Sequence, residues 1–232
     1  RKESSAASDV YKRQDQLFLE NPIQIMVGGS GLYVDAVLKG LDYFPEVDKK
    51  IREDLTKELH DKGIKSLQER LKNLDTKTYN TIALDNPHRI MRALEICIGT
   101  GKTYSEFKNK PKATRNFNFI KVGLTADREI IYNRINQRVD IMIENGLKEE
   151  AKKLYHNKEL NALQTVGYRE LFSYFDGDFT KEFAISEIKK NTRRFAKRQI
   201  TWFKKDEDTL WFDYETDILR IITNISDKIN SF

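Results

Sequence analysis

The sequence predicts an α/β fold whose core is interrupted by a mostly helical segment, and three observations support this class. A short apolar run at 23–27 leads into a Gly-rich turn and then into a helical pattern. Strand patterns return at 118–125 and at 209–213, each beside a helical pattern. Between these regions the chain is heavily charged and helical in its periodicity. Short buried strands that alternate with helices are typical of a parallel sheet covered by helices.

The first strand is expected at 23–27, followed by a tight turn at 28–31 (GGSG) and a helix at 32–38 that Gly40 closes. Such a turn lies at the carboxyl end of a parallel strand, where ligands bind in α/β proteins. Glycine also lets a ligand approach the backbone closely. A turn that only joins the two elements fits equally well on local grounds. The spacing differs from the G-x-G-x-x-G pattern, so we infer no dinucleotide site.

A helical insertion subdomain is expected at 45–112, hinged to a core that 17–44 and 113–232 form. Its apolar residues recur at helical spacing, and Gly63 and Asp75 break the pattern into two or three short helices. The 16 residues at the N-terminus are polar and follow no pattern, so we leave 1–16 unassigned, as a tail or a sequence scar.

Another helix of the insertion is expected to begin at Pro87, with Asp85 or Asn86 as its cap. Arg89 and Arg92 are three residues apart and therefore share one face of this helix.

The segment 99–103 (GTGKT) resembles the end of a P-loop. The full motif needs a glycine at position 96, where the chain has Ile96, and a P-loop follows a strand rather than a helix. We therefore expect Gly99 and Gly101 to end the preceding helix.

The C-terminal half is expected to continue the core. A helix that starts at Asp127 carries Arg134 and Arg138, four residues apart on one face; a solvated edge paired with Glu129 and Asp140 is the alternative interpretation. The remaining expected elements are a short helix at 147–155, a helix through Leu171 and Phe175, a helix at 183–205, a strand at 209–213 and a helix at 217–229.

The helix at 183–205 is the most strongly charged element. Helical spacing of about 100° per residue puts Ile185, Ile188, Phe195, Gln199 and Phe203 on one stripe. Eight cations lie beside or beyond that stripe: Lys189, Lys190, Arg193, Arg194, Lys197, Arg198, Lys204 and Lys205. No acid lies between Glu187 and Asp206, so we expect these charges not to be neutralised locally. A solvated surface helix is the generic interpretation. The arginines, which suit phosphate, and Trp202 with Phe203, which suit stacked bases, favour a grip on a nucleic-acid backbone.

Composition agrees with a polyanionic partner. The formal net charge is +5 with a pI near 9.0, and 33% of residues are charged. Cys97 is the single cysteine, which excludes an intrachain disulfide and gives no argument for secretion. No apolar run is long enough to span a membrane, so we expect a cytoplasmic protein. The three histidines lack metal-ligand spacing.

Six blocks occur in a fixed order: 27–33 (VGGSGLY), 86–95 (NPHRIMRALE), 101–103 (GKT), 134–146, 166–170 (VGYRE) and 192–202 (TRRFAKRQITW). Together they resemble one family, the bacterial tRNA dimethylallyltransferases, also called tRNA isopentenyltransferases. Each block alone is weak, but six in sequence are specific, and they cover the chain from about Pro22 to Trp202.

The resemblance implies a P-loop-NTPase-like α/β core with a partial parallel sheet and a helical insertion. It implies transfer of a dimethylallyl group from dimethylallyl diphosphate to the exocyclic amine of the adenine next to the tRNA anticodon. By the same resemblance Ser30 lines the channel where the flipped adenine meets the donor, and Arg138 holds the donor's diphosphate. The residues implied to contact the tRNA anticodon stem-loop are Arg52, His88, Arg89, Arg92, Gln164, Thr165, Gly167, Tyr168, Arg169, Lys197, Arg198, Gln199, Trp202 and Lys204. Mg²⁺ is the implied cofactor, with no ligand in this chain, and we expect a monomer.

One departure from the family pattern is serious. The G-x-x-x-x-G-K-[ST] loop and the aspartate base that the family places before the first block have no counterpart in this sequence. We therefore expect a truncated enzyme with no catalytic residue of its own, inactive when alone. A non-catalytic RNA-binding module is the alternative, and a small-molecule kinase is disfavoured because no complete P-loop is present.

Overall fold

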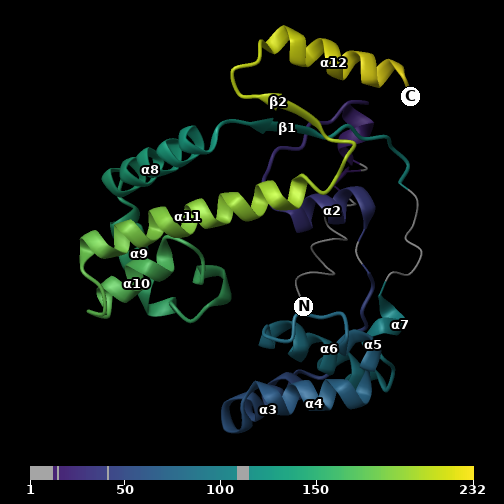
Figure 1. Ribbon diagram of the computed structural model, residues 1–232, viewed down its shortest axis with the longest axis vertical. Coiled ribbons are helices and arrows are strands. Elements are labelled where there is room, and N and C mark those ends of the chain that lie inside the picture. The colour runs from purple at the N-terminus through teal and green to yellow at the C-terminus, as the bar shows by residue number, and fades with distance from the viewer. Residues whose placement is uncertain (1–12, 15, 41, 109–114) are drawn as a thin grey trace. The chain divides into compact units, whose positions relative to one another are not determined.

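The structure is a computed structural model of the 232-residue chain and describes residues 13–14, 16–40, 42–108 and 115–232. The chain divides into two compact units (Figure 1). Unit 1 comprises residues 1–28 and 32–116, and unit 2 comprises residues 29–31 and 117–232. Most of the unassigned segment 1–16 lies outside the described residues. The boundaries expected from the sequence, and the hinge at the insertion, stay a prediction.

Unit 1 is helical in its described part. Its elements are α2 (Gly31–Lys39, of which Gly31 belongs to unit 2), α3 (Lys49–Lys62), α4 (Ile64–Leu74), α5 (Thr76–Tyr79), α6 (Pro87–Thr100) and α7 (Tyr104–Phe107). The core forms where α3, α4 and α6 meet, and Leu55, Leu67, Leu71, Ile90 and Leu94 are at most 1% exposed there. The helices α3, α4 and α6 bury the apolar edges that their sequence periodicity predicts.

The helix boundaries predicted at Gly63, Asp75 and the start of α6 are confirmed. Gly63, at φ 74°, separates α3 from α4 in a conformation that favours glycine. Asp75 caps α5 by accepting hydrogen bonds from the backbone N–H and the hydroxyl of Thr78, 2.9 and 2.6 Å away. Asn86, rather than Asp85, caps α6, and Pro87 occupies its first turn.

Gly99 does not end α6, contrary to our expectation; Gly101 does, in the left-handed conformation at φ 69°. Gly99 lies inside the helix because Val47 occupies the space that a side chain would need. A Cβ at position 99 would come within 2.4 Å of the Val47 Cγ1 atom. The segment 99–103 is therefore a helix end, as expected, and not a P-loop.

Unit 2 combines a helical cluster with a small sheet. Its elements are β1 (Val122–Thr125), α8 (Arg128–Glu144), α9 (Leu147–Leu154), the short 3-10 turns η1 (Tyr155–Asn157) and η2 (Asn161–Leu163), α10 (Tyr168–Phe175), α11 (Lys181–Phe203), β2 (Leu210–Asp213) and α12 (Ile218–Asn230). Figure 1 shows α8 running beside α11, and these two helices are in contact. Val139, Ala151, Leu171, Phe172 and Ile188 bring α8, α9, α10 and α11 together in one core.

The sheet is parallel, as predicted, but has only two strands in the described part of the chain. β1 and β2 pair from Val122 with Leu210 to Thr125 with Asp213. Gly123 faces Trp211, and a Cβ on Gly123 would lie 2.6 Å from the indole ring. The lack of a side chain at Gly123 therefore makes room for the Trp211 ring.

Residues 23–27, where we predicted a strand, are assigned to neither a helix nor a strand. Ile25 is 87% exposed and Val27 is 91% exposed. A buried parallel strand needs a neighbour on which to satisfy its backbone groups. An apolar composition alone was therefore not enough to place this strand.

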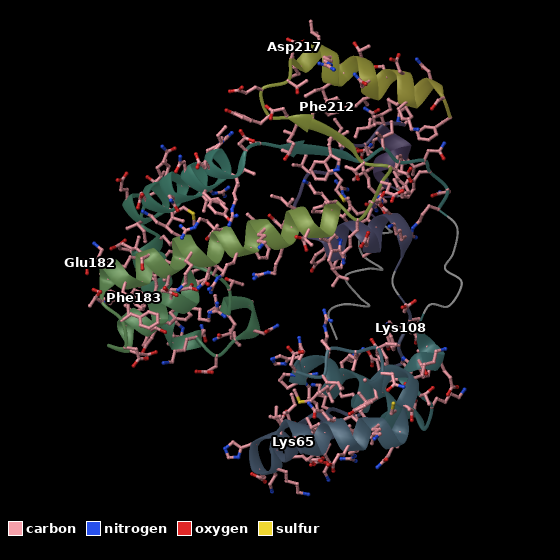
Figure 2. All side chains as sticks on the ribbon, in the orientation of Figure 1. Lys65, Lys108, Glu182, Phe183, Phe212 and Asp217 are labelled. Atoms are coloured by element: carbon pink, nitrogen blue, oxygen red, sulfur yellow. The ribbon has the colours of Figure 1, made fainter. Side chains whose placement is uncertain are left out.

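The last helix, α12, is amphipathic, and none of its residues is buried in the described structure. Asp217, labelled in Figure 2, caps it by accepting from the N–H groups of Leu219 and Arg220. Among the helices of the described residues, none is both apolar enough and long enough to cross a membrane.

Candidate nucleic-acid interface

Helix α11 carries the longest run of basic side chains in unit 2. Thr180 caps it by accepting from Phe183 N–H at 3.2 Å, and Figure 2 labels Glu182 and Phe183 in this first turn. Ala184 and Ile188 are buried and fix the N-terminal half against α8 and α10. The C-terminal half, after Thr192, has no buried residue. One half of the helix is thus anchored, and the other presents its surface.

Acidic side chains neutralise two of the eight cations in the basic row. For these two, our expectation that the charges are not neutralised was wrong. Lys189 forms an ion pair with Asp140 of α8 at 2.6 Å, and Lys190 pairs with Glu187 one turn earlier. The five remaining lysines and arginines from position 194 onward are exposed and have no ion pair within the described ranges: Arg194, Lys197, Arg198, Lys204 and Lys205. The row therefore holds its unneutralised charge toward its C-terminal end.

Phe195 also departs from the predicted apolar stripe, since it is 46% exposed. The Arg198 guanidinium lies 5.5 Å from the centre of its ring, and Lys205 lies 5.6 Å from the centre of the Trp202 ring. Trp202 itself is 41% exposed. Exposed aromatic faces beside cations suit stacking on nucleobases next to phosphates.

The Gly-rich turn contacts the same end of α11. The Gln199 side-chain amide donates a hydrogen bond to the Gly29 carbonyl at 2.8 Å. Gly31 also lies against α11, because a Cβ at this position would come within 2.3 Å of the Trp202 ring. Ser30 lies between these two contacts and is exposed. The structure thus brings Ser30 together with Gln199 and Trp202.

A second cluster of predicted residues lies where the loop at 164–167 enters α10. Glu170 is 3% exposed and accepts from Gly167 N–H at 2.7 Å and from the Asn191 side chain of α11 at 2.8 Å. Arg169 contacts the same carboxylate at 3.4 Å. Glu170 thereby ties this loop to α11. The signal was present in the sequence, since glutamate three residues after a helix cap is a capping-box pattern.

Other side chains near this loop are held at its edge. The Gln164 side chain donates to the Lys158 carbonyl at 2.6 Å, while Thr165 is exposed. The Tyr168 hydroxyl donates to Glu150, and this hydrogen bond raises the pKa of Tyr168 above its usual value, with burial adding to the effect.

The predicted residues of unit 1 form a separate surface. Arg52 of α3 and Arg92 of α6 both bind Glu95, at 2.6 and 3.3 Å, and Glu95 is 3% exposed. His88 and Arg89, in the first turn of α6, are exposed. Glu95 belongs to the recognised block at 86–95, but the sequence alone gave no role to it.

Arg138, the predicted diphosphate ligand, projects from α8 next to the buried Val139. It is exposed and has no ion pair within the described residues. Arg134 lies 5.6 Å from the centre of the Tyr214 ring instead. Arg138 is thus available to an anionic ligand.

A pocket of about 320 Å³ opens between the end of β1, the start of α8 and the second half of α11. Three cations line it, Arg128, Lys197 and Lys204, together with the hydroxyls of Thr125 and Thr201 and no carboxylate. Such a lining suits an anionic group. Sequence analysis did not single out Arg128, because the contact with α11 becomes visible only in the fold.

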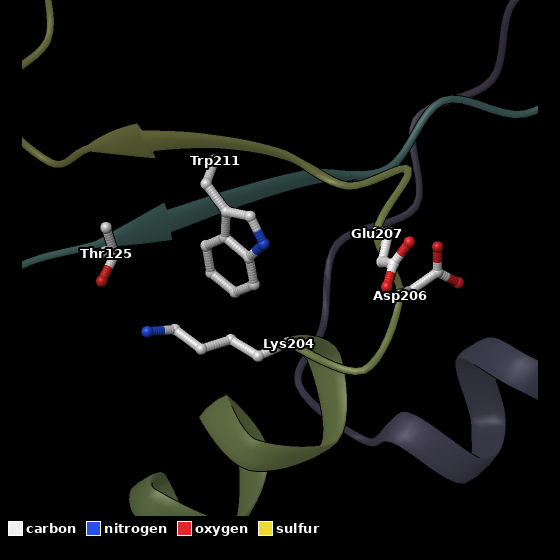
Figure 3. Close-up of a pocket in the computed structure, with 5 residues that line it drawn as sticks. All are labelled: Thr125, Lys204, Asp206, Glu207 and Trp211. Carbon is white, nitrogen blue, oxygen red and sulfur yellow. The ribbon is translucent and has the colours of Figure 1, made fainter.

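Lys204 also lines a neighbouring pocket of about 470 Å³ with Thr125, Asp206, Glu207 and Trp211 (Figure 3). The Lys204 side chain extends beneath the Trp211 ring toward Thr125, and the two acids lie on the opposite side. Asp206 is already paired with Lys121. This second pocket therefore has mixed charge.

The described residues do not offer a Mg²⁺ site by themselves. Within 13–14, 16–40, 42–108 and 115–232, no three His, Cys, Asp or Glu side chains are arranged so that they could hold an ion. In proteins Mg²⁺ usually takes one or two carboxylates and completes its coordination with water and substrate phosphates.

Comparison with known proteins identifies the relatives of this chain. The family described as IPP transferase matches residues 7–206. A "tRNA dimethylallyltransferase" of Flavobacterium psychrophilum is 62% identical over 227 residues, which cover 95% of this chain and 74% of the relative. A "tRNA dimethylallyltransferase 1" of Bacteroides fragilis is 45% identical over 210 residues, which cover 90% of this chain and 70% of the relative.

Two solved structures are also similar. The full-length tRNA isopentenylpyrophosphate transferase of Bacillus halodurans is 35% identical, with a TM-score of 0.60, over 97% of this chain and 73% of that chain. A eukaryotic dimethylallyltransferase acting on tRNA gives a TM-score of 0.76 over 97% of this chain and 61% of that chain. Its identity is 23%, so this likeness concerns the fold alone.

Proposed function

Because the chain belongs to the IPP transferase family, we propose that it modifies tRNA by transferring a dimethylallyl group from dimethylallyl diphosphate to the exocyclic amine of an adenine next to the anticodon. In this reaction the bond between the allylic carbon and the diphosphate oxygen breaks, and a bond forms between that carbon and the amine nitrogen. The amine proton passes to a base, and diphosphate leaves. The fold that supports this reaction is a P-loop-NTPase-like core with a helical insertion hinged to it.

The observation that carries the proposal is the pairing of an exposed basic helix end with the Gly-rich turn. Unneutralised cations of α11 lie beside Trp202, and Gln199 and Trp202 contact the turn that holds Ser30. In our proposal the cations bind RNA phosphates, the exposed rings stack on bases, and Ser30 lies where the adenine enters. An adenine must leave its stack to reach such a site.

The donor side has a candidate residue in Arg138. Its guanidinium is exposed and has no ion pair among the described residues, so it is available to the diphosphate. Stabilising the charge that develops on a leaving diphosphate is the main task of a protein in phosphate chemistry. The 232 residues contain no complete G-x-x-x-x-G-K-[ST] motif, whose amides and lysine would hold the same group.

We further propose that these 232 residues by themselves bind tRNA without measurable transfer. The relatives offer the control, since this chain covers 74% of the F. psychrophilum enzyme. Transfer from labelled dimethylallyl diphosphate to unmodified tRNA is measured for the chain alone and for the chain fused to the N-terminal part of that relative.

The fused protein is expected to modify the tRNA, and the 232-residue chain is expected only to bind it. Robust transfer by the chain alone would contradict the proposed lack of activity. If RNA binds but neither protein transfers the group, the chain acts as a non-catalytic RNA-binding module, which is our second candidate function.

A further inference from the structure

We propose that the buried Glu95 is a positioning residue on unit 1, and that it holds Arg52 and Arg92, which the family resemblance already implies to contact tRNA, together as one phosphate-binding site. The ligand of this site is a backbone phosphate of RNA. The inference rests on the proposed function, and it adds how the helical unit contributes to RNA binding. Glu95 is a positioning residue, because it acts through the two arginines rather than on the RNA.

The three side chains come from two helices that the core of unit 1 holds together. The Nη1 atom of Arg52, on α3, lies 2.6 Å from Glu95 Oε1. The Nη1 atom of Arg92, on α6, lies 3.3 Å from Glu95 Oε2. Each carboxylate oxygen thus accepts from a different arginine, which brings both guanidiniums to the same carboxylate.

Exposure differs sharply across this group. The Glu95 side chain is only 5% exposed, whereas those of Arg52 and Arg92 are 50% and 41% exposed. A guanidinium carries five N–H donors in a fixed plane, so one bond to Glu95 leaves donors for another acceptor. The carboxylate therefore lies beneath the arginines and does not compete for their solvent side.

Arg92 is restrained from a second direction. Its guanidinium carbon lies 5.6 Å from the centre of the Phe44 ring, which holds the group by a cation–π contact. Two positive charges on one buried negative charge leave a net charge of about +1 on the exposed side, and forked donors of this kind match phosphate oxygens. Preorganised donors lose less conformational entropy when the ligand binds.

Substitution of Glu95 distinguishes two effects that this residue could have on RNA binding, the positioning of the arginines and the repulsion of RNA by its own negative charge. Removal of a carboxylate near a bound polyanion would strengthen RNA binding if charge alone mattered. If Glu95 holds the arginines in place, Glu95→Gln weakens binding even though the protein becomes more positive. The two explanations thus predict changes of opposite sign.

The test uses the full 232-residue chain and a labelled RNA hairpin with an anticodon-type loop, with affinity measured by fluorescence anisotropy over a range of salt. We expect Glu95→Gln to weaken RNA binding about three- to tenfold. The upper value corresponds to the loss of about one charge-assisted hydrogen bond to the RNA. Arg52→Lys keeps the charge at an exposed position but cannot form a fork, and it should weaken binding by a similar factor. The matched control is Glu58→Gln, which removes a carboxylate that binds Arg70 at 2.8 Å in the same unit. The control should bind as tightly as wild type or slightly tighter.

A double-mutant cycle tests whether the arginines form one site. The double variant Arg52→Gln/Arg92→Gln should bind RNA much less weakly than the product of the two single effects predicts. The slope of log affinity against log salt concentration should fall by about one, which corresponds to the loss of one phosphate contact. Fully multiplicative effects, or a Glu95→Gln protein that binds as well as wild type, would overturn the inference.

A competition experiment with inorganic diphosphate distinguishes RNA from the prenyl donor as the ligand. Diphosphate added at constant ionic strength should not displace the RNA from this site. Displacement that Arg52→Lys abolishes would assign the site to the donor instead. If wild type binds no RNA hairpin, the proposed function fails together with this inference.

Discussion

Replacement of Gly31 by alanine tests the contact between the Gly-rich turn and α11. A Cβ at this position would lie 2.3, 2.4 and 2.7 Å from three atoms of the Trp202 indole, closer than any ordinary contact. The indole must therefore move, and it has room to do so because it is 41% exposed. Crowding of this kind costs about 1–3 kcal/mol, while alanine in a helix returns up to about 1 kcal/mol, so we expect a net loss of about 1 kcal/mol in stability.

The loss in RNA affinity should be larger than the loss in stability. Stacking of a base on an aromatic ring contributes about 1–3 kcal/mol, so a displaced Trp202 should weaken binding by about fivefold or more. Binding is measured by anisotropy, stability by denaturant unfolding, and the position of the ring by intrinsic tryptophan fluorescence. Trp211 is the only other tryptophan, and a Trp211→Phe background isolates the signal of Trp202.

Gly28→Ala is the matched control, since a Cβ there would meet nothing within 4 Å. It should leave emission, stability and RNA affinity unchanged. If Gly31→Ala behaves like Gly28→Ala in all three measurements, the indole does not lie against this turn, and the reasoning about the site is refuted.

Three other predictions concern the two units. Asp75 is 2% exposed; its burial raises its pKa, but hydrogen bonds from Thr78 and Ser105 outweigh burial and hold the pKa below the usual value. That contribution to stability is present above the unfolded pKa of about 3.9 and is lost as the pH falls through the folded pKa. Asp75→Asn should therefore destabilise unit 1 by about 1–3 kcal/mol near pH 7 and by less in acid, as measured by chemical unfolding at several pH values; equal losses at all pH values would contradict this. Glu170→Ala should release the loop at 164–167 and speed its amide hydrogen exchange, and unchanged protection would refute its role as a tie. In the fused, active protein, Arg138→Ala should raise the KM for the donor more than the Kd for tRNA, while Arg198→Ala should do the reverse.

Local signals in the sequence predicted the helices well. Gly63, Asp75, Asn86 and Gly101 mark helix ends, and each acts within a few residues through a cap or a left-handed conformation. Such effects are short in range, so the sequence contains them. Gly99 was misassigned because its role is to make room for Val47, more than fifty residues earlier in the chain.

The strand at 23–27 shows the limit of an apolar pattern. Its residues have the composition of a buried strand, yet a strand exists only where a partner satisfies its backbone. In the described structure no strand is assigned to this segment, and its side chains are exposed. Periodicity cannot reveal which strands meet.

The sequence predicted which residues of α11 are basic, but not which of them form ion pairs with acids. Glu187 lies one turn before Lys190 and pairs with it, and α8 supplies Asp140 to Lys189 from 49 residues away. Glu95 was missed because it binds Arg52 on another helix, and the bond from Asn191 of α11 to Glu170 was missed for the same reason, although the local cap by Glu170 has a signal in the sequence. Residue types could be read from the sequence, whereas their partners depend on the fold.

The salt dependence of RNA binding tests the central claim most directly. Affinity of the 232-residue chain for an anticodon stem-loop hairpin is measured between about 50 and 200 mM salt, for wild type and for a variant with Arg194, Lys197 and Arg198 replaced by glutamine. If α11 holds about three phosphates, wild-type affinity should fall by about a decade or more across this range, and the variant should lose most of that slope. A wild-type affinity that stays flat, or a variant with an unchanged slope, would show that α11 is not the surface that binds RNA.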